Sequence, residues 1–80
     1  MVLKIEVFGT GCVNCRQLEK NVRDAVGELG LAIEVIKIED FETLIKRGIT
    51  MTPGLAIDGE IVAMGRVPSV EDVKGMISER

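Results

Sequence analysis

Two cysteines, Cys12 and Cys15, stand three residues apart in the stretch GTGCVNC and are the only cysteines of the 80-residue chain. At the first turn of a helix, backbone N–H groups lack intrahelical partners and the helix dipole is positive, so a thiolate is stabilised there. If a helix begins at Cys12, Cys15 lies one turn further along on the same side, where the two sulfurs can bond. The spacing therefore predicts a redox pair, with Cys12 as the attacking thiolate and Cys15 as the resolving thiol.

Two other uses of this cysteine pair are a structural crosslink and a metal site. A disulfide between them would close a four-residue loop and remove only about 2 kcal/mol of unfolded-state entropy, against about 3 for a fifteen-residue loop. The chain has no histidine, which excludes a Cys-His nucleophile pair, a Ser-His-Asp triad and a mixed Cys/His zinc site within one subunit. Disulfide exchange is the favoured chemistry, and binding of a soft metal by the two thiolates stays open.

The composition is that of one small soluble domain, which we expect to span residues 1–80. A net charge of −3 and only two aromatic residues, both Phe, argue against nucleic-acid binding. No apolar run approaches the roughly 18 residues that span a bilayer, and the N-terminal stretch MVLKIEVF lacks the features of a signal peptide. We expect a cytoplasmic protein with no membrane contact and no cofactor. In that reducing compartment a lone cysteine pair is more often catalytic than structural.

The first half of the chain reads as a crossover between two parallel strands. Residues 2–8 alternate between apolar and charged side chains, which predicts a strand. Apolar residues then recur every three or four positions across residues 12–29, which predicts a helix closed by Gly30. Residues 31–38 are rich in β-branched side chains and predict a second strand, parallel to the first because a long helix separates the two.

The second half predicts a short helix, a hairpin and a closing helix. Asp40 can cap the short helix, and Ser69 can cap the last one. Residues 55–64 carry apolar runs on both sides of Asp58-Gly59, the dipeptide that suits a two-residue type I′ turn. The order is β-α-β-α-β-β-α, which gives a four-stranded mixed sheet flanked by helices on both faces.

The stretch GTGCVNC after a first strand, MTPGLAIDGE ahead of a hairpin, and a closing helix resemble the thioredoxin superfamily, specifically its small glutaredoxin-like, single-domain prokaryotic redox proteins. The resemblance implies a monomeric thiol-disulfide oxidoreductase that reduces protein disulfides and is recycled by a reductase. It also implies that the Thr52-Pro53 bond is cis and faces the cysteines. Because Pro53 has no N–H, an edge is left on which an extended substrate segment could pair with the backbone of Thr52.

The sequence departs from the superfamily pattern at several places. Gly11 stands where thioredoxins usually carry Trp, and Val13-Asn14 separates the cysteines in place of Gly-Pro or Pro-Tyr. Gly65-Arg66 replaces the double glycine that helps glutaredoxins to hold glutathione. Neither the redox potential nor the use of glutathione is therefore implied by the resemblance.

Glu6 lies six residues before Cys12, the offset at which thioredoxins keep a buried acid that handles the proton of the second cysteine. If the short second helix covers Glu6, we expect its pKa to rise, so that the carboxylate can act as proton acceptor for Cys15. The alternative is that Glu6 belongs to a solvated polar face together with Lys4.

Two alternative functions use the same cysteines. GTGCVNC also resembles the G-M-x-C-x-x-C loop of small ferredoxin-like copper chaperones, so the chain could carry Cu(I) or bind Zn(II) between two copies. Those domains run β-α-β-β-α-β and end on a strand, and Thr10 replaces their characteristic methionine. The second alternative is a redox sensor that binds a partner in one oxidation state only.

Overall fold

The structure is a computed structural model that describes residues 4–79. Its elements, in chain order, are β1 (Lys4–Phe8), α1 (Val13–Leu29), β2 (Glu34–Ile38), α2 (Phe41–Lys46), β3 (Gly54–Ile57), β4 (Glu60–Met64) and α3 (Val70–Ser78). This order confirms the predicted β-α-β-α-β-β-α arrangement. The first two residues of the predicted first strand, 2 and 3, lie outside the described residues.

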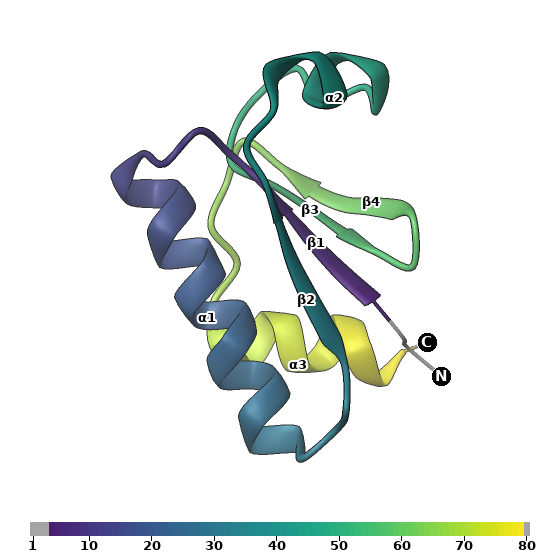
Figure 1. The fold of residues 1–80 in the computed structure, drawn as a ribbon. Helices are drawn as coiled ribbons and strands as arrows, with labels where there is room; N and C mark the ends of the chain where they lie inside the picture. Colours follow the sequence, from purple (N-terminus) through teal and green to yellow (C-terminus); the bar gives the residue numbers. More distant parts are fainter. Residues whose placement is uncertain (1–3, 80) are drawn as a thin grey trace.

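The four strands form one mixed sheet in the order β2-β1-β3-β4 (Figure 1). Strand β1 pairs in parallel with β2 and antiparallel with β3, and β3 pairs antiparallel with β4. The parallel β1–β2 pair joined by α1 is the predicted crossover. The central strands β1 and β3 are paired on both sides, which gives the motifs at their ends a rigid support.

The two faces of the sheet carry different helices, as predicted. Along β1 successive side chains point to opposite faces. Ile5 and Val7 join the larger core together with residues of α1 and α3. Phe8 joins a smaller core with Leu44 of α2 and Ala56 of β3. We refer to these below as the α1 face and the α2 face of the sheet.

Local signals in the sequence set the limits of the elements. Cys12 and Ser69 are the N-caps of α1 and α3, and Asp40 caps α2 through its carboxylate. Helix α1 ends at Gly30, whose left-handed conformation (φ 67°) a residue without Cβ adopts at little cost. The helix nearest in length to a membrane span is α1, and among residues 4–79 no helix is long and apolar enough to cross a membrane.

The hairpin turn has the predicted geometry, and one predicted strand is too long. Asp58 and Gly59 both have positive φ angles, 49° and 88°, as a type I′ turn requires. Strand β2 begins at Glu34, three residues later than the sequence predicted. Residues 31–33 instead carry the chain from the end of α1 back to the sheet, and Leu31 is half-exposed.

Candidate active site

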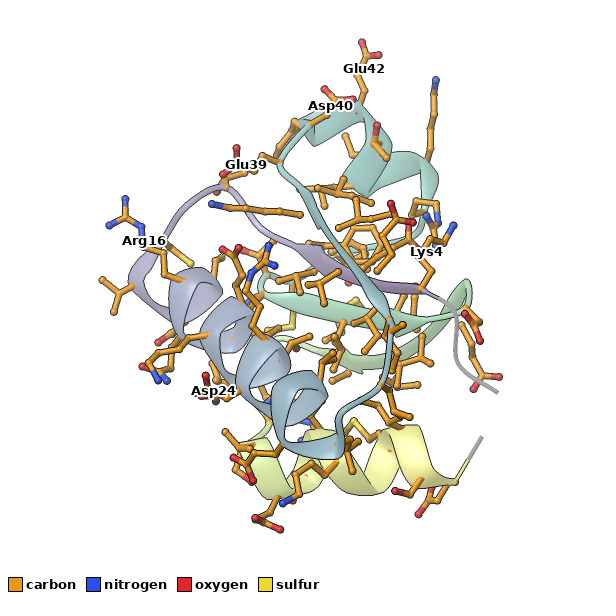
Figure 2. All side chains as sticks on the ribbon, turned by 60° about the horizontal axis from the view of Figure 1, so that its bottom comes forward. Lys4, Arg16, Asp24, Glu39, Asp40 and Glu42 are labelled. Carbon is orange, nitrogen blue, oxygen red and sulfur yellow. The ribbon has the colours of Figure 1, made fainter. Side chains whose placement is uncertain are left out.

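Cys12 is the N-cap of α1, so its sulfur lies at the end of the helix where backbone N–H groups are unpaired. The backbone N–H of Cys15 donates to the Cys12 sulfur over 3.2 Å. The Cys12 carbonyl meanwhile accepts the first bond of the helix, from the N–H of Arg16. Figure 2 shows Arg16 projecting outward from this first turn. The predicted placement of Cys12 at a helix start is therefore confirmed.

The two cysteines differ in exposure and in pKa. Cys12 is exposed, whereas Cys15 is 2% exposed, and both are free thiols. Hydrogen bonds from the Cys15 thiol and from the backbone N–H groups of Cys15 and Asn14 lower the pKa of Cys12. Burial, followed by the hydrogen bond to Cys12, raises the pKa of Cys15. Near neutral pH this arrangement favours a thiolate on Cys12 beside a protonated Cys15.

Gly9 makes the close packing of Cys15 possible. A Cβ atom at Gly9 would overlap the sulfur of Cys15. Gly9 follows β1 and continues its alternation, so that the missing side chain would point to the α1 face like Val7. Gly9 was not predicted from the sequence to belong to the site. Its only signal is a glycine directly after a strand and ahead of a cysteine motif.

The Thr52-Pro53 bond is cis, as the resemblance implied. In the antiparallel register of β1 and β3, Phe8 pairs with Gly54. The residues that follow β1 toward Cys12 and the residues Thr52-Pro53 that precede β3 therefore lie at the same end of the sheet. Thr52 is exposed and Pro53 is buried, with the Pro53 carbonyl accepting a hydrogen bond from the Gly65 N–H over 2.8 Å.

Glu6 is buried on the α2 face and is paired with Arg47, the C-cap residue of α2. Both carboxylate oxygens accept from the guanidinium, over 2.7 and 2.8 Å, and the guanidinium lies 5.2 Å from the centre of the Phe8 ring. The hydrogen bonds from Arg47 outweigh burial and lower the pKa of Glu6. The predicted rise in this pKa is wrong, because the guanidinium of Arg47, 41 residues away in sequence, binds both oxygens and stabilises the charged carboxylate.

The alternative interpretation of Glu6 as a solvated residue is also wrong, since its relative exposure is 4%. Glu6 and Cys15 lie on different faces of the sheet, because Glu6 alternates with Ile5 and Val7, which face α1. The predicted role of Glu6 as proton acceptor for Cys15 stays a prediction. Arg47 was not identified from the sequence, because nothing near it in the chain points to an acid on the first strand.

Metal-ligating residues do not gather elsewhere in the described part of the chain. Within residues 4–79 no group of three or more His, Cys, Asp or Glu side chains is placed to hold a metal ion. The sulfurs of Cys12 and Cys15, which are hydrogen-bonded to each other, form a pair of soft-metal donors within one copy of the chain.

Comparisons with known proteins agree with this geometry. The family model described as "Thioredoxin domain" matches residues 3–78. A curated protein named "Thioredoxin" from Methanothermobacter thermautotrophicus is 49% identical over 77 residues, which covers 96% of this chain and all of the relative. A second, from Methanocaldococcus jannaschii, is 43% identical over 74 residues, 92% of this chain and 85% of the relative.

Solved structures support the fold at lower identity. A structure titled "Structure of a malarial protein" superposes with a TM-score of 0.76 at 14% identity and covers 99% of this chain and 97% of its own. A structure of thioredoxin-2, described as a component of malaria parasite protein secretion machinery, gives 0.75 at 16% identity and covers 99% and 84%. At these identities the match concerns the fold alone.

Proposed function

The chain belongs to the thioredoxin family of thiol-disulfide oxidoreductases, and from this premise we propose that it reduces protein disulfides with Cys12 as the attacking thiolate and Cys15 as the resolving thiol. The observation that carries the assignment of roles is the asymmetry of the pair. The exposed sulfur is the one that accepts hydrogen bonds at the helix start, and its pKa is lowered. The buried sulfur has the raised pKa.

The reaction proceeds in two exchanges. The Cys12 thiolate attacks one sulfur of the substrate disulfide, that S–S bond breaks, and the other substrate sulfur leaves as a thiolate. The Cys15 thiol then loses its proton and attacks the Cys12 sulfur, which releases the second substrate sulfur and forms the Cys12–Cys15 disulfide. The substrate gains two electrons and the protein dithiol loses two. A reductase must then supply two electrons to the Cys12–Cys15 disulfide and regenerate the dithiol before the next turnover.

The low pKa of Cys12 helps both exchanges. A lower pKa raises the thiolate fraction near neutral pH and makes Cys12 a better leaving group when Cys15 attacks. The raised pKa of Cys15 keeps its thiol protonated while Cys12 attacks, and the second exchange follows once the mixed disulfide has formed. In this reaction the protein positions the two sulfurs and lowers the pKa of Cys12, and the exchange needs no resident cofactor.

We assign substrate docking to the backbone of Thr52 and to Pro53. Thr52 is exposed at the end of the sheet where the cysteines lie, and Pro53 has no N–H to offer to a neighbouring strand. An extended substrate segment beside Thr52 can add hydrogen bonds to its backbone while presenting a disulfide to Cys12.

We propose that Glu6 acts as a proton acceptor for Cys15 through water rather than by direct contact, because the two residues lie on opposite faces of the sheet and both carboxylate oxygens are bound by Arg47, so that the Glu6–Arg47 pair must open first. Near neutral pH the Glu6→Gln variant then resolves a mixed disulfide more slowly than the unmodified protein. An equal rate for the two proteins would assign the Cys15 proton to water and leave Glu6 a purely structural role. We further propose that the protein acts in the cytoplasm as a monomer.

Reduction of insulin by the dithiol form, with the variants Cys12→Ser and Cys15→Ser, tests the proposed function. The unmodified protein is expected to cleave insulin disulfides, and both variants to lose turnover. Cys15→Ser should accumulate a stable mixed disulfide through Cys12, whereas Cys12→Ser should accumulate none. If Cys12→Ser traps substrate and Cys15→Ser does not, the assigned roles are reversed. If the unmodified protein leaves insulin intact, it does not reduce protein disulfides of this kind.

A Cu(I) competition titration separates the proposed function from soft-metal carriage. Tight binding of Cu(I) by the dithiol form, without insulin turnover, would support a carrier. The number of partners that Cys15→Ser traps separates a general reductant from a sensor, because a sensor is expected to trap one.

A further inference from the structure

Two methionines lie beside the proposed docking site at Thr52-Pro53. Met51 directly precedes Thr52, and Met64 ends β4 at the position that pairs with Gly54. They are 60% and 39% exposed. A methionine of α3, Met76, is instead partly buried against the core on the α1 face. Met51 and Met64 are therefore open to reagents in solution, at the end of the sheet where the cysteines lie.

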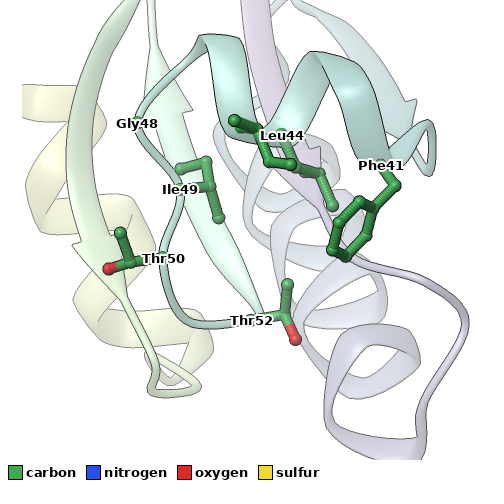
Figure 3. A pocket seen from close by; sticks show the side chains of 7 residues that line it. Phe41, Leu44, Gly48, Ile49, Thr50 and Thr52 are labelled. Atoms are coloured by element: carbon green, nitrogen blue, oxygen red, sulfur yellow. The ribbon is translucent and has the colours of Figure 1, made fainter.

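The Met64 sulfur holds the loop of residues 48–52 in place. The Thr50 backbone N–H donates to this sulfur over 3.4 Å, and the Thr50 hydroxyl donates to it over 3.7 Å. The loop lines a hollow beside α2, and Figure 3 shows it with Thr50 next to β4 and Thr52 at its far end. Among residues 4–79 no other hydrogen bond fastens residues 50–52. The position of this segment therefore depends on a thioether, which is a weak acceptor.

The Met51 side chain packs against the residue that is bonded to Pro53. A Cβ atom at Gly65 would lie 3.0 to 3.3 Å from the methyl, the Cβ and the sulfur of Met51, so this side chain runs along the Gly65 backbone. Gly65 in turn donates its N–H to the Pro53 carbonyl over 2.8 Å. An oxygen atom added to the Met51 sulfur on that side would push the side chain off Gly65.

Oxidation of these two sulfurs would change the contacts that hold the loop. A sulfur lone pair attacks one oxygen of a peroxide, the O–O bond breaks, and the hydroxide that leaves takes up the proton of the transferred oxygen and departs as water. The sulfur loses two electrons and the peroxide gains two. The sulfoxide is polar, and its oxygen extends beyond the sulfur. On Met64 the Thr50 N–H must then move to this new acceptor atom or lose its bond.

The cysteines react with peroxide before the methionines do. In the dithiol form the Cys12 thiolate is the better nucleophile, and its sulfenic acid condenses with the Cys15 thiol to the disulfide. After that step Met51 and Met64 are the most exposed sulfur-containing residues still reduced among residues 4–79. Peroxide that reaches the disulfide form therefore meets these two thioethers next.

We propose that Met51 and Met64 are a peroxide-sensitive modification site that controls substrate docking. Conversion of either thioether to a sulfoxide displaces residues 50–52, so that substrate segments pair less well with Thr52, while the hydrogen bonds to the Cys12 sulfur stay as they are. Enzymes that reduce methionine sulfoxide reverse the change. The proposal rests on the proposed function, because it concerns the docking of substrates for the same cysteines.

Treatment of the disulfide form with hydrogen peroxide tests the proposal. The peroxide is then removed, dithiothreitol regenerates the dithiol, and mass spectrometry follows the oxygen added to each methionine. Cleavage after Glu60 separates Met51 from Met64. We expect both to be oxidised at least threefold faster than Met76, with Met51 the faster of the two. Oxidation no faster than that of Met76 would overturn the proposal.

Two substrates distinguish a docking effect from damage to the cysteines. In the peroxide-treated protein we expect KM for insulin to rise about fivefold and kcat to change less than twofold, because a hydrogen bond that positions the loop is lost. Reaction of the dithiol with dithiobisnitrobenzoate, a small disulfide that needs no docking along Thr52, should keep its rate within twofold. An equal loss for both substrates, or an unchanged KM for insulin, would overturn the proposal.

The double variant Met51→Leu with Met64→Leu assigns the effect, because leucine is close to methionine in volume and takes up no oxygen. Each protein is compared with itself before and after peroxide, so a change in its starting activity cancels. The double variant should keep its KM, and the matched control Met76→Leu should show the full rise. Each single variant should show part of the rise, which keeps the test valid if the double variant does not fold.

The outcomes separate this proposal from the function on which it rests. A rise in KM that persists in the double variant would place the sensitive group elsewhere and overturn the proposal, while the proposed function stays intact. Failure of the untreated protein to reduce insulin would instead count against the proposed function. A far-UV circular dichroism melt verifies that each variant, before and after peroxide, is folded.

Discussion

The ion pair between Glu6 and Arg47 predicts a loss of stability that depends on pH in a particular direction. The change is Arg47→Met, which keeps an unbranched stem over the Phe8 ring and removes the charge. The Glu6 side chain is 5% exposed, so in the variant its carboxylate is buried without a cationic partner. Breaking a buried pair in this way costs about 3 to 5 kcal/mol of unfolding free energy.

We expect a cost near the lower limit, about 3 kcal/mol at pH 7.5, because the Arg47 side chain is 30% exposed and water can enter its place. For a domain of 80 residues the total unfolding free energy is about 4 to 12 kcal/mol, so this loss is a large fraction of it. The measurement is urea unfolding followed by far-UV circular dichroism, since the chain contains no Trp or Tyr for fluorescence.

The pH dependence follows from the direction of the pKa shifts. In the unmodified protein the pKa of Glu6 is lowered, so the pair stabilises the fold fully above the unfolded carboxyl value of about 4.3 and less as pH falls below it. In Arg47→Met only the weaker attraction of Lys4 opposes the effect of burial, so we expect the pKa of Glu6 to rise and the variant to lose stability as pH rises through that value. The difference between the two proteins should therefore grow from about 1 kcal/mol at pH 4 to about 3 at pH 7.5.

Two further variants separate this explanation from a general effect of mutation. Adding Glu6→Gln to Arg47→Met removes the buried charge and should recover at least half of the loss at pH 7.5. Arg23→Met breaks only an exposed pair with Glu19 and should cost less than about 0.5 kcal/mol at any pH. A cost for Arg47→Met that is the same at pH 4 and 7.5, or a double variant less stable than the single, would refute the reasoning.

Three other features of the structure give simpler predictions. Alkylation of Cys12 by iodoacetamide should reach half its maximal rate below the ordinary thiol value of about 8.5, whereas Cys15 in a Cys12→Ser protein should need a higher pH; coincident profiles would contradict the lowered and raised pKa values. Gly9→Ala should cost about 1 to 3 kcal/mol in urea unfolding and slow release of a mixed disulfide by Cys15, because the new methyl group overlaps its sulfur; unchanged kinetics would show that the sulfur has room to move. Gly27→Ala, in the last turn of α1 with no atom beyond the local helix backbone within 4 Å of the new Cβ, should raise stability by about 0.5 kcal/mol, while Gly30→Ala, at φ 67°, should lower it; the same sign for both would contradict the assigned backbone conformations.

Features that depend on neighbours in sequence were predictable. The spacing of the cysteines placed Cys12 at a helix start, and Asp58-Gly59 set the hairpin turn, because helix caps and two-residue turns are decided within a few residues. Even the capping box of α3, with Ser69 and Asp72 bonded to each other's backbone, follows from residues three apart. The cis bond at Thr52-Pro53 required the family resemblance as well.

Features that depend on tertiary contacts were not predictable. The partner of Glu6 lies 41 residues away at the end of α2, and only the packing of that helix on the sheet brings it near. The direction of a pKa shift reverses with such a partner, so burial alone gave the wrong sign for Glu6. The contact between Gly9 and Cys15 likewise depends on how closely α1 approaches the end of β1.

The sheet separates the reactive sulfurs from the buried ion pair, although the residues of both alternate along the sequence. Helix α1 carries both sulfurs on one face, where Gly9 leaves room for Cys15, while the Glu6–Arg47 pair lies on the other face. Because Phe8 pairs with Gly54, the loop that leads to Cys12 and the loop that contains Thr52 lie at the same end of the sheet. Substitution of Arg47 can therefore alter the stability of the fold without changing the hydrogen bonds that lower the pKa of Cys12. A loss of stability in Arg47→Met with an unaltered alkylation profile of Cys12 would be the direct consequence of this separation.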